Sequence, residues 1–409
     1  MARPPHLPTD EVFRTSPELA NQLSLAVRAG SARKLCGRLY TTNLIESPEA
    51  IVRRNLWRVV ALTVPGAVVS HRTAIEMQPT ASGTVFLTGK SSRVIELPGI
   101  RLRMMAGPGP IEGDTPFLQQ LHKASEARAF LECLGVRKLR GSESPGLPRV
   151  EVERRLERVS LRGEHALNRL RDAARAIAPS LAAEIALGEL DGLIRALLGT
   201  RIAALHDPSA RARARGAPYD PGRLHLFQQL IAALAEWPST SRPFPSRDGP
   251  EWEHSAFFDA YFSNFIEGTE FEVGEAAGIV FQNRMPVGRP EDAHDVLGSY
   301  SLVSNSQWMG ESASRLADHP DQFLTLLKQR HAVVMQARPD KRPGEFKVAR
   351  NRAGSTLFVE PERVEGTLRQ GFELFRSLVD PFHRAVFTMF LIAEVHPFDD
   401  GNGRTAAHS

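Results

Sequence analysis

The sequence predicts a mainly α-helical protein, with a small α/β domain first and a helical bundle with a β-hairpin flap last. Three observations support this fold class. Apolar residues recur at three- and four-residue steps through most of the chain beyond residue 149. Short segments with two-residue alternation are concentrated near the N-terminus. Three joints rich in Pro, Gly and small polar residues separate these regions: 142–148, 207–223 and 237–250.

These joints predict three parts in the chain. The first is a winged-helix-like α/β regulatory domain over 1–141, and the second is a helical connector over 149–206. The third is a helical domain over 218–409. A length of 409 residues leaves enough chain for a separate core in more than one of them.

Composition narrows the class of protein. A hydrophobic content of 42% and a charged content of 24% are ordinary for a globular protein. Cys36 and Cys133 lie far apart and fit neither a metal site nor a disulfide framework. The N-terminus lacks the pattern of a signal peptide, and no apolar run is long enough to cross a membrane. We therefore expect a cytoplasmic protein with no membrane partner.

The net charge of +4 conceals an asymmetry along the chain. Residues 1–215 carry 32 Lys and Arg against 21 Asp and Glu, whereas residues 216–409 carry 19 against 26. The first half is therefore at +11 and the second at −7. A basic first half favours an anionic partner such as DNA. Solvated charged faces of helices are an equally weighted alternative.

The N-terminal region shows a pattern compatible with a winged helix-turn-helix. Residues 10–40 are expected to form short helices, followed by the alternating, glycine-containing segment RKLCGRLYTT, which would be the β-wing. Strands are expected at 84–89 and 99–105. Residues 10–135 loosely resemble the N-terminal region of AbiEi-type antitoxins and transcriptional regulators, which implies DNA binding. A small α/β domain that binds no DNA is the alternative.

Two elements stand out in the last part of the chain. Around a glycine turn in 342–361, Phe346 and Val348 alternate on one side with polar residues, which predicts a β-hairpin. A final helix is expected to begin with Asp380 as N-cap and Pro381 at the first position. Its sequence, AVFTMFLIAEV, is apolar on nearly every face, so the helix should be buried.

The stretch HPFDDGNGR, which follows this helix, combines groups that suit phosphoryl chemistry. His396 is a candidate general base, and Asp400 is a candidate ligand for Mg²⁺. A tight glycine turn can direct backbone N–H groups toward phosphates, and an adjacent arginine adds a fixed positive charge. The residues of this predicted cradle are Gly401, Asn402, Gly403 and Arg404. A glycine-rich surface turn beside a core histidine is the alternative reading.

The same stretch resembles the signature of the Fic (Fido) family, HPFx(D/E)GNGRxxR, and the resemblance extends back to about residue 250. It implies a nucleotidyltransferase that moves AMP from Mg-ATP to a Ser, Thr or Tyr hydroxyl of a protein substrate, a reaction called AMPylation. His396 would deprotonate the hydroxyl, and Asp400 would hold Mg²⁺. Pro397 and Phe398 would anchor the loop, and the hairpin would be the flap that holds the target. Transfer of phosphocholine or another nucleotide-linked group remains open.

A second motif, SNFIEGTEF, resembles the inhibitory signature of the family, (S/T)xxxE(G/N). The matching residues are Ser263, Glu267 and Gly268. Since they precede the catalytic motif, they imply a class II arrangement in which Glu267 enters the ATP site. A solvated helix start would also explain this short pattern.

The chain departs from the family pattern in two places. Ala407 stands where the family has a second arginine, which removes the expected partner of Glu267. Only TAAHS follows the motif, so we expect a truncated Fic domain that lacks most of the next helix and is inactive if that helix is essential. A DNA-binding, antitoxin-like regulator with a degenerate Fic domain is the alternative function, and homo-oligomerisation stays open. We expect most of the remaining histidines, which include His71, His254 and His294, to lie at the surface.

Overall fold

The computed structural model describes residues 7–136, 143–163, 165–238, 249–310 and 319–408. The chain divides into two compact units, residues 1–210 and residues 211–409. Helices predominate, and the strands are concentrated in the first unit, as the sequence predicts. Among the described residues, none of the helices is both long and apolar enough to cross a membrane.

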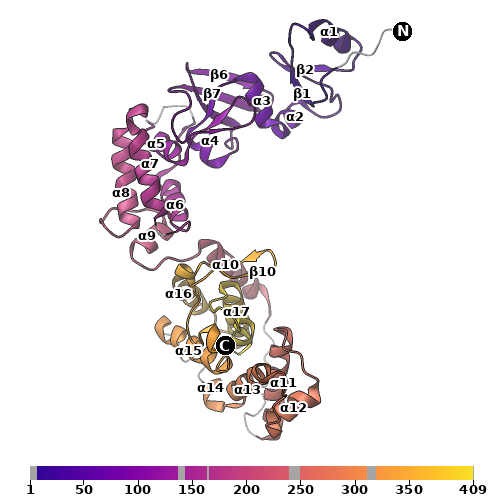
Figure 1. The fold of residues 1–409 in the computed structure, drawn as a ribbon, viewed down its shortest axis with the longest axis vertical. Coiled ribbons are helices and arrows are strands. Elements are labelled where there is room, and N and C mark those ends of the chain that lie inside the picture. The colour runs from indigo at the N-terminus through magenta and orange to yellow at the C-terminus, as the bar shows by residue number, and fades with distance from the viewer. Residues whose placement is uncertain (1–6, 137–142, 164, 239–248, 311–318, 409) are drawn as a thin grey trace. The chain divides into compact units, whose positions relative to one another are not determined.

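The first unit begins with a small three-stranded sheet in the order β1-β3-β2. Figure 1 labels two of its strands, β1 and β2, close to α1. Its strands are β1 (Val12–Arg14), β2 (Arg33–Cys36) and β3 (Leu39–Thr41). The segment RKLCGRLYTT therefore forms a hairpin, as predicted. The expectation of several short helices over 10–40 is wrong. This stretch holds one helix, α1 (Ala20–Arg28), and the strand β1 precedes it. The next helices, α2 (Pro48–Arg54) and α3 (Leu56–Thr63), follow the hairpin.

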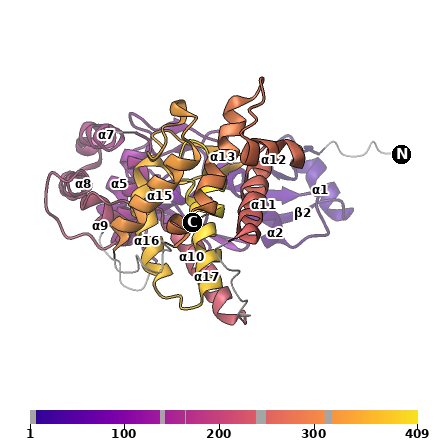
Figure 2. The same cartoon turned by 90° about the horizontal axis from the view of Figure 1, so that it is seen from below.

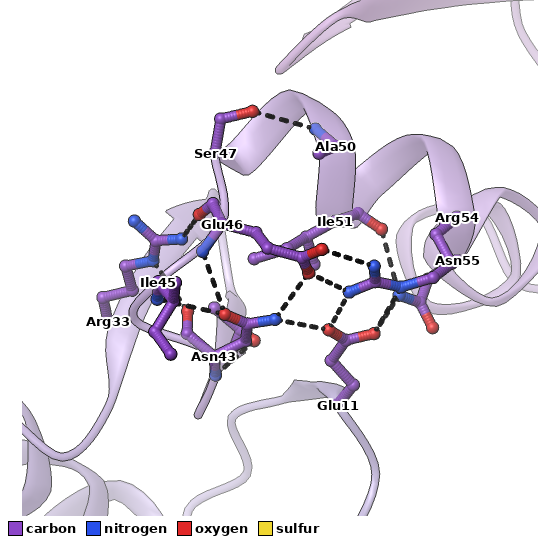
Figure 3. A network of polar contacts seen from close by, with 11 residues as sticks. Glu11, Arg33, Asn43, Ile45, Glu46, Ser47, Ala50, Ile51, Arg54 and Asn55 are labelled. Atoms are coloured by element: carbon purple, nitrogen blue, oxygen red, sulfur yellow. Dashed lines mark hydrogen bonds and ion pairs between the residues drawn. The ribbon is translucent and has the colours of Figure 1, made fainter.

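A polar network fastens this sheet to α2 (Figure 3). Arg54 forms ion pairs with Glu11, just before β1, and with Glu46, just before α2. Asn43 joins the same two carboxylates through its amide nitrogen, at 2.9 Å from Glu11 Oε1 and 2.8 Å from Glu46 Oε2. Hydrogen bonds from Arg54, Asn55 and Asn43 lower the pKa of Glu11 to about 2. The network thus joins segments that are well separated in sequence.

A six-stranded mixed sheet follows, in the order β6-β7-β5-β4-β9-β8. Its longest strands, β5 (Thr84–Gly89) and β7 (Ile100–Ala106), pair in parallel and match the two predicted strands. Beside them lie shorter strands: β4 (Val68–Val69), β6 (Arg93–Leu97), β8 (Thr115–Pro116) and β9 (His122–Lys123). Buried side chains from β5, β7 and α3 form one core, which includes Val60, Val85, Leu87 and Leu102.

Helices complete the first unit. The sheet is followed by α5 (Glu126–Leu134), which packs against α4 (His71–Glu76) and against two later helices, α7 (Ala166–Leu181) and α8 (Glu184–Leu197). The remaining helices of this part are α6 (Arg149–Ser160) and α9 (Pro208–Ala214). The predicted helical stretch from 149 therefore contains α6, α7 and α8.

The second unit is a bundle of helices (Figures 1 and 2). Buried apolar side chains form several clusters between these helices. One group consists of α11 (Pro250–Ile266), α12 (Val273–Gln282) and α13 (Pro290–Ser304), and α11 packs closely on α13. The other group has α10 (Pro221–Glu236), α15 (Pro320–Val334), α16 (Val364–Phe375) and α17 (Pro381–Val395). Two short elements are α14 (Ser306–Gly310) and a 3-10 turn at Pro339–Lys341.

The predicted hairpin is present, but its register differs from the expectation. The paired strands are only β10 (Arg352–Ala353) and β11 (Thr356–Leu357), around Gly354. Phe346 and Val348 lie outside the ladder. The reason is that their segment pairs elsewhere, since the backbone N–H of Lys347 donates to Pro397 O at 2.9 Å. A 3-10 turn at Pro361–Arg363 then leads into α16.

The last two helices carry the predicted motif. Asp380 caps α17 as predicted, accepting from His383 N at 3.0 Å, and Pro381 is the first helical residue. Asn402–Ala407 forms a short helix, α18, in contact with α11, α15 and α17. A helix of this length is not stable by itself. It forms here because its side chains, including Asn402, Thr405 and Ala406, are buried by the surrounding helices.

Candidate functional site

His396 lies at the C-terminal end of α17, in a backbone conformation that directs the chain away from the helix. Its φ of 52° is left-handed, and its N–H still donates to Ile392 O at 2.8 Å. The imidazole ring stacks on Phe358, which follows β11, with ring centroids 3.8 Å apart and planes 7° apart. The flap region and the end of α17 thus fix the orientation of the imidazole.

The environment of His396 keeps the imidazole neutral. The pKa of His396 is lowered to about 4, mainly by burial. The charge of Lys347 acts in the same direction, and Asp400 acts in the opposite direction. A hydrogen bond to the backbone of Ala393 occupies one ring nitrogen. The other nitrogen then has a lone pair, which is the form a general base requires.

Lys347 is a buried cation beside this base. Its side chain is almost fully inaccessible, and burial lowers its pKa to about 8. The ammonium donates to Asn351 Oδ1 at 2.6 Å and lies 3.4 Å from Val395 O. It therefore acts on His396 through its charge and ties the flap to the end of α17.

The loop after His396 is closed by its own asparagine. Asn402 Oδ1 accepts from the N–H of Phe398 at 2.8 Å, and Asn402 Nδ2 donates to Phe398 O at 2.9 Å. The Phe398 ring is fully buried. The buried ring of Phe398 thus anchors the loop. The amide group of Asn402 points toward Phe398 and hydrogen-bonds within the loop.

His331 on α15 contacts the loop through its ring face and a ring nitrogen. Its ring lies flat on Phe398, with centroids 3.7 Å apart. Gly344 N donates to His331 Nδ1 at 2.9 Å, which leaves Nε2 to donate to Asp400 O at 3.1 Å. Burial lowers the pKa of His331 to about 4, in keeping with a neutral ring that accepts at one nitrogen and donates at the other.

Asp400 is the predicted metal ligand. One of its carboxylate oxygens, Oδ1, accepts from Gly401 N at 2.8 Å. Among the described residues, no group of three or more acidic, His or Cys side chains could hold a metal ion. A single carboxylate still fits Mg²⁺, which takes one or two carboxylates and completes its shell with phosphates and water. The neighbouring Asp399 is instead paired with Arg342 at 2.8 Å.

The glycine turn has no room for side chains. Gly401 has a φ of 67°, and a Cβ there would meet Met335 Sδ at 2.5 Å. A Cβ on Gly403 would meet Glu267 Oε1 at 1.7 Å. The Glu267 carboxylate accepts a hydrogen bond from the backbone N–H of Gly403, so it occupies the position predicted for a phosphate.

The electrostatics of Glu267 match this position. Although the residue as a whole is exposed, its carboxylate is sufficiently shielded that desolvation raises its pKa. Arg404 opposes this effect, and Asp400 reinforces it. A phosphate at Gly403 would have to displace the glutamate.

Arg404 turns into the bundle. It is almost fully buried, and its Nη1 lies 2.7 Å from Asp295 Oδ2 on α13 and 3.4 Å from Asn264 Oδ1 on α11. Arg338 shares the same aspartate at 2.8 Å. The arginine thus joins α18 to two helices, and in this conformation its guanidinium is engaged with their side chains.

The two remaining residues of the predicted inhibitory motif lie on either side of the end of α11. Ser263 is buried and its hydroxyl lies 3.1 Å from His408 Nε2, just after α18. Gly268 has a φ of 89°, which lets the chain turn away directly after Glu267. The structure therefore brings Ser263 to α18 and Glu267 to the glycine turn.

Several residues of this site carried no usable signal in the sequence. Lys347, His331 and Asp295 lie far from the motif in the chain, and nothing in their local patterns sets them apart. Phe358 and Asn351 belong to the predicted flap, whose position beside the motif was implied only by the family resemblance. A search for polar residues on otherwise apolar helix faces would have selected His331.

The motif lies within a match to a known protein family. Residues 323–409 match the model of the Fic/DOC family. Residues 323–409, which contain the motif, are therefore similar to the Fic/DOC family, as the sequence predicted.

Two solved structures of Fic-1 fragments from C. elegans are similar to this chain. A point variant is 20% identical with a TM-score of 0.30, covering 59% of this chain and 75% of the other. The fragment without that substitution is 19% identical with a TM-score of 0.31, covering 63% and 80%. No curated protein matches the chain.

Proposed function

We propose that the second unit is a protein adenylyltransferase, which transfers AMP from Mg-ATP to a Ser, Thr or Tyr hydroxyl of another protein. One observation carries this proposal: a neutral, oriented histidine precedes a carboxylate suited to Mg²⁺ and a glycine turn within one closed loop. His396, Asp400 and Gly403 are the residues concerned. The similarity of residues 323–409 to the Fic/DOC family supports it.

The chemistry follows from the positions of these groups. The target hydroxyl oxygen attacks the α-phosphorus of ATP, and its proton passes to the free ring nitrogen of His396. The bond from the α-phosphorus to the bridging oxygen breaks, and pyrophosphate leaves with that electron pair. Backbone N–H groups of the glycine turn would bind phosphate oxygens once Glu267 moves away. Mg²⁺ held by Asp400 would supply positive charge to the phosphates.

Under this proposal, the described conformation is inactive because Glu267 occupies the phosphate position. Its carboxylate takes the N–H of Gly403 and adds negative charge where phosphates would bind. The second arginine of the family pattern is Ala407 here, so this restraint rests on Gly403 and on the charge of Arg404. A restraint of this kind should be weaker than a direct ion pair.

Autolabelling tests the proposal. Purified protein is incubated with Mg²⁺ and ATP labelled on the α-phosphate, beside His396→Ala and Glu267→Gly variants. We expect retained label in the wild type, more label in Glu267→Gly, and none in His396→Ala. ATP labelled on the γ-phosphate should leave no label, because that phosphate departs with pyrophosphate. Absence of α-label from folded Glu267→Gly protein would refute the proposal.

A DNA-binding function of the first unit is the second candidate. The observation that favours it is the β2–β3 hairpin, which forms as predicted and carries the exposed cations Lys34 and Arg38. Arg54 contributes less, because Glu11 and Glu46 neutralise it. A hairpin with cations at its turn can contact phosphates of DNA.

Salt dependence of DNA binding tests this second candidate. We expect binding of duplex DNA to weaken steeply with salt, and the Lys34→Gln, Arg38→Gln double variant to reduce the slope. A Lys90→Gln variant, which alters an exposed cation on another loop, is the matched control. Equal binding by the double variant and the wild type would exclude the hairpin as the contact.

A further inference from the structure

The first unit contains a cavity of about 330 Å³ that is lined by residues of α4, α5 and α6. This volume lies at the lower end of the range of small-molecule sites. One wall is apolar and consists of Ala74, Ile75, Ala124, Ala129 and Phe130. The other wall is basic and comes mainly from α6. The cavity therefore offers a small ligand an apolar face and a charged face.

The apolar wall is held in place by the packing of α4 on α5. Ala74, Ala124 and Ala129 belong to one buried apolar cluster. His71, the first residue of α4, is only 8% exposed, so it is an exception to the expectation that most of the remaining histidines lie at the surface. Its backbone N–H donates to Glu132 Oε2 on α5 at 2.9 Å, which joins the two helices. This side of the cavity is therefore formed before a ligand arrives.

Four cations gather on the basic wall: Lys123, Arg155, Arg158 and Arg162. The three arginines share one side of α6 and of the turn that follows it, because steps of three, four and seven residues return to the same face of a helix. Lys123 belongs to β9 and comes from a different part of the chain. Glu126 is the one carboxylate of this lining in the described structure.

Ion pairs compensate these cations only in part. Arg162 is paired with Glu126 at 2.7 and 2.9 Å, and 60% of the Arg162 side chain is exposed. Arg155 Nε lies 2.9 Å from Glu151 Oε1 without the alignment of a hydrogen bond. Within the described parts of the chain, Lys123 and Arg158 have no carboxylate partner. These two cations therefore carry uncompensated charge.

The surroundings do not cancel this charge. Glu76 on α4 is paired with Arg72 at 2.9 Å. Glu153 and Glu157 lie on the opposite face of α6, where Glu153 accepts from the backbone N–H of Asp207 at 2.7 Å. The ion-paired neighbours of the basic wall are Arg154, Glu151 and Asp207. Counted together with these neighbours, the lining keeps an excess of two positive charges.

From these features we propose that the cavity binds a small phosphate monoester. Such a group carries a charge of about −2 near neutral pH, which matches the excess, and its oxygens suit the forked N–H donors of arginine. Arg155, Arg158 and Lys123 hold the phosphate, and the organic part lies on Ile75 and Phe130. A carboxylate would compensate only half of the excess charge, and a triphosphate would exceed it.

The test is titration calorimetry of the full chain with phenyl phosphate, in a buffer free of phosphate and sulfate. Phenyl sulfate has the same ring and a single negative charge, and phenol has the ring without a charge. We expect phenyl phosphate to bind, phenyl sulfate to bind about tenfold more weakly, and phenol to show no measurable binding.

Three variants assign the binding to this cavity. Arg158→Gln removes an uncompensated cation and should weaken the binding of phenyl phosphate about tenfold. Arg169→Gln changes an exposed arginine on α7 outside the lining, and it should have no effect. Glu126→Gln removes the carboxylate that competes for Arg162, so it should strengthen binding about threefold. Arg158 and Glu126 are exposed, so these variants should fold, and a phosphate site at the Fic motif would not respond to them.

Each outcome decides for or against the proposal. No binding of phenyl phosphate, or equal binding of phenyl sulfate, overturns it. Equal affinities of Arg158→Gln and Arg169→Gln overturn it as well, because the ligand then binds elsewhere or by general attraction to a basic surface. Duplex DNA binding that Arg158→Gln weakens, without binding of phenyl phosphate, overturns it in favour of a nucleic-acid contact. Weaker binding in Arg158→Gln together with tighter binding in Glu126→Gln supports it.

Discussion

His396 has a pKa near 4 rather than near 6.5, and this changes the expected pH profile of labelling. A general base works in its neutral form, so activity should be lost only as the pH falls through the folded pKa. We therefore expect the labelling rate of Glu267→Gly protein to stay nearly level from pH 8 to about 5. Initial rates measured across this range check it. A midpoint near pH 6.5 would contradict the burial of the imidazole.

Lys347 provides a second test of the same environment. Its positive charge lowers the pKa of His396, so Lys347→Met should move the acid limb of the labelling profile to higher pH. Met retains the length of the side chain without the charge. Lys341→Met, at a half-exposed cation in the 3-10 turn before the flap, should leave the limb unchanged. An unchanged acid limb in Lys347→Met would mean that the charge of Lys347 does not affect the pKa of His396.

Glu267 should control nucleotide access through its charge. Glu267→Gln keeps the size of the side chain but removes the negative charge beside Gly403, so we expect tighter binding of Mg-ATP by about tenfold or less. Titration calorimetry measures it. Glu270→Gln, an exposed glutamate in the same loop, is the matched control. Equal affinities in the two variants would show that Glu267 does not obstruct the phosphates.

At the scale of elements, the N-cap of α17 should stabilise the helix whose C-terminal end carries His396. Asp380→Ala removes the acceptor of His383 N and should destabilise the second unit by about 1 kcal/mol. Asp380→Asn keeps an acceptor oxygen and should recover most of this loss. Chemical denaturation, followed by the fluorescence of tryptophan in this unit, measures both. Equal losses in the two variants would argue against a capping role.

The network around Glu11 makes the small N-terminal sheet sensitive to acid. The pKa of Glu11 is about 2 in the folded protein, against an ordinary 4.5, so its contribution is fully present above the ordinary value. It is lost as the pH falls through the folded value. We expect Glu11→Gln to cost about 1 kcal/mol at pH 7 and to reduce the loss of stability between pH 4.5 and 2. Hydrogen exchange of β1 and β3 amides checks this.

The elements differ in how far the sequence predicts them. The start of α17 and the strands β5 and β7 follow from caps and alternation, which are local signals. The flap register and α18 do not, because each depends on contacts with distant segments. Lys347 leaves the ladder to pair with Pro397, and α18 is held by burial against α11, α15 and α17.

The same distinction applies to the site. His396, Asp400 and the glycines come from one contiguous motif, so the sequence alone brings them together. The direction of Arg404 could not be predicted, because its partner Asp295 lies much earlier in the chain. The sequence assigns Asn402 to the phosphate cradle and does not reveal that its side chain closes the loop through the backbone of Phe398.

For the molecule as a whole, the division into two units predicts two separable unfolding events. Each unit has its own apolar core, with Leu87 in the first and Leu391 in the second. Leu87→Ala and Leu391→Ala should each destabilise one unit by about 3 kcal/mol and leave the other transition in place. Calorimetry of the full chain measures both transitions. A single transition lowered equally by both variants would show that the units unfold together.

The clasp between Asn402 and Phe398 has a kinetic consequence. Because two hydrogen bonds and a buried ring already fix the loop, its backbone does not have to become ordered when a nucleotide arrives. Little conformational entropy is then lost on binding, and the rate of association should be set by how often Glu267 departs. The opening of one carboxylate, rather than the folding of a loop, would then limit the rate of nucleotide binding.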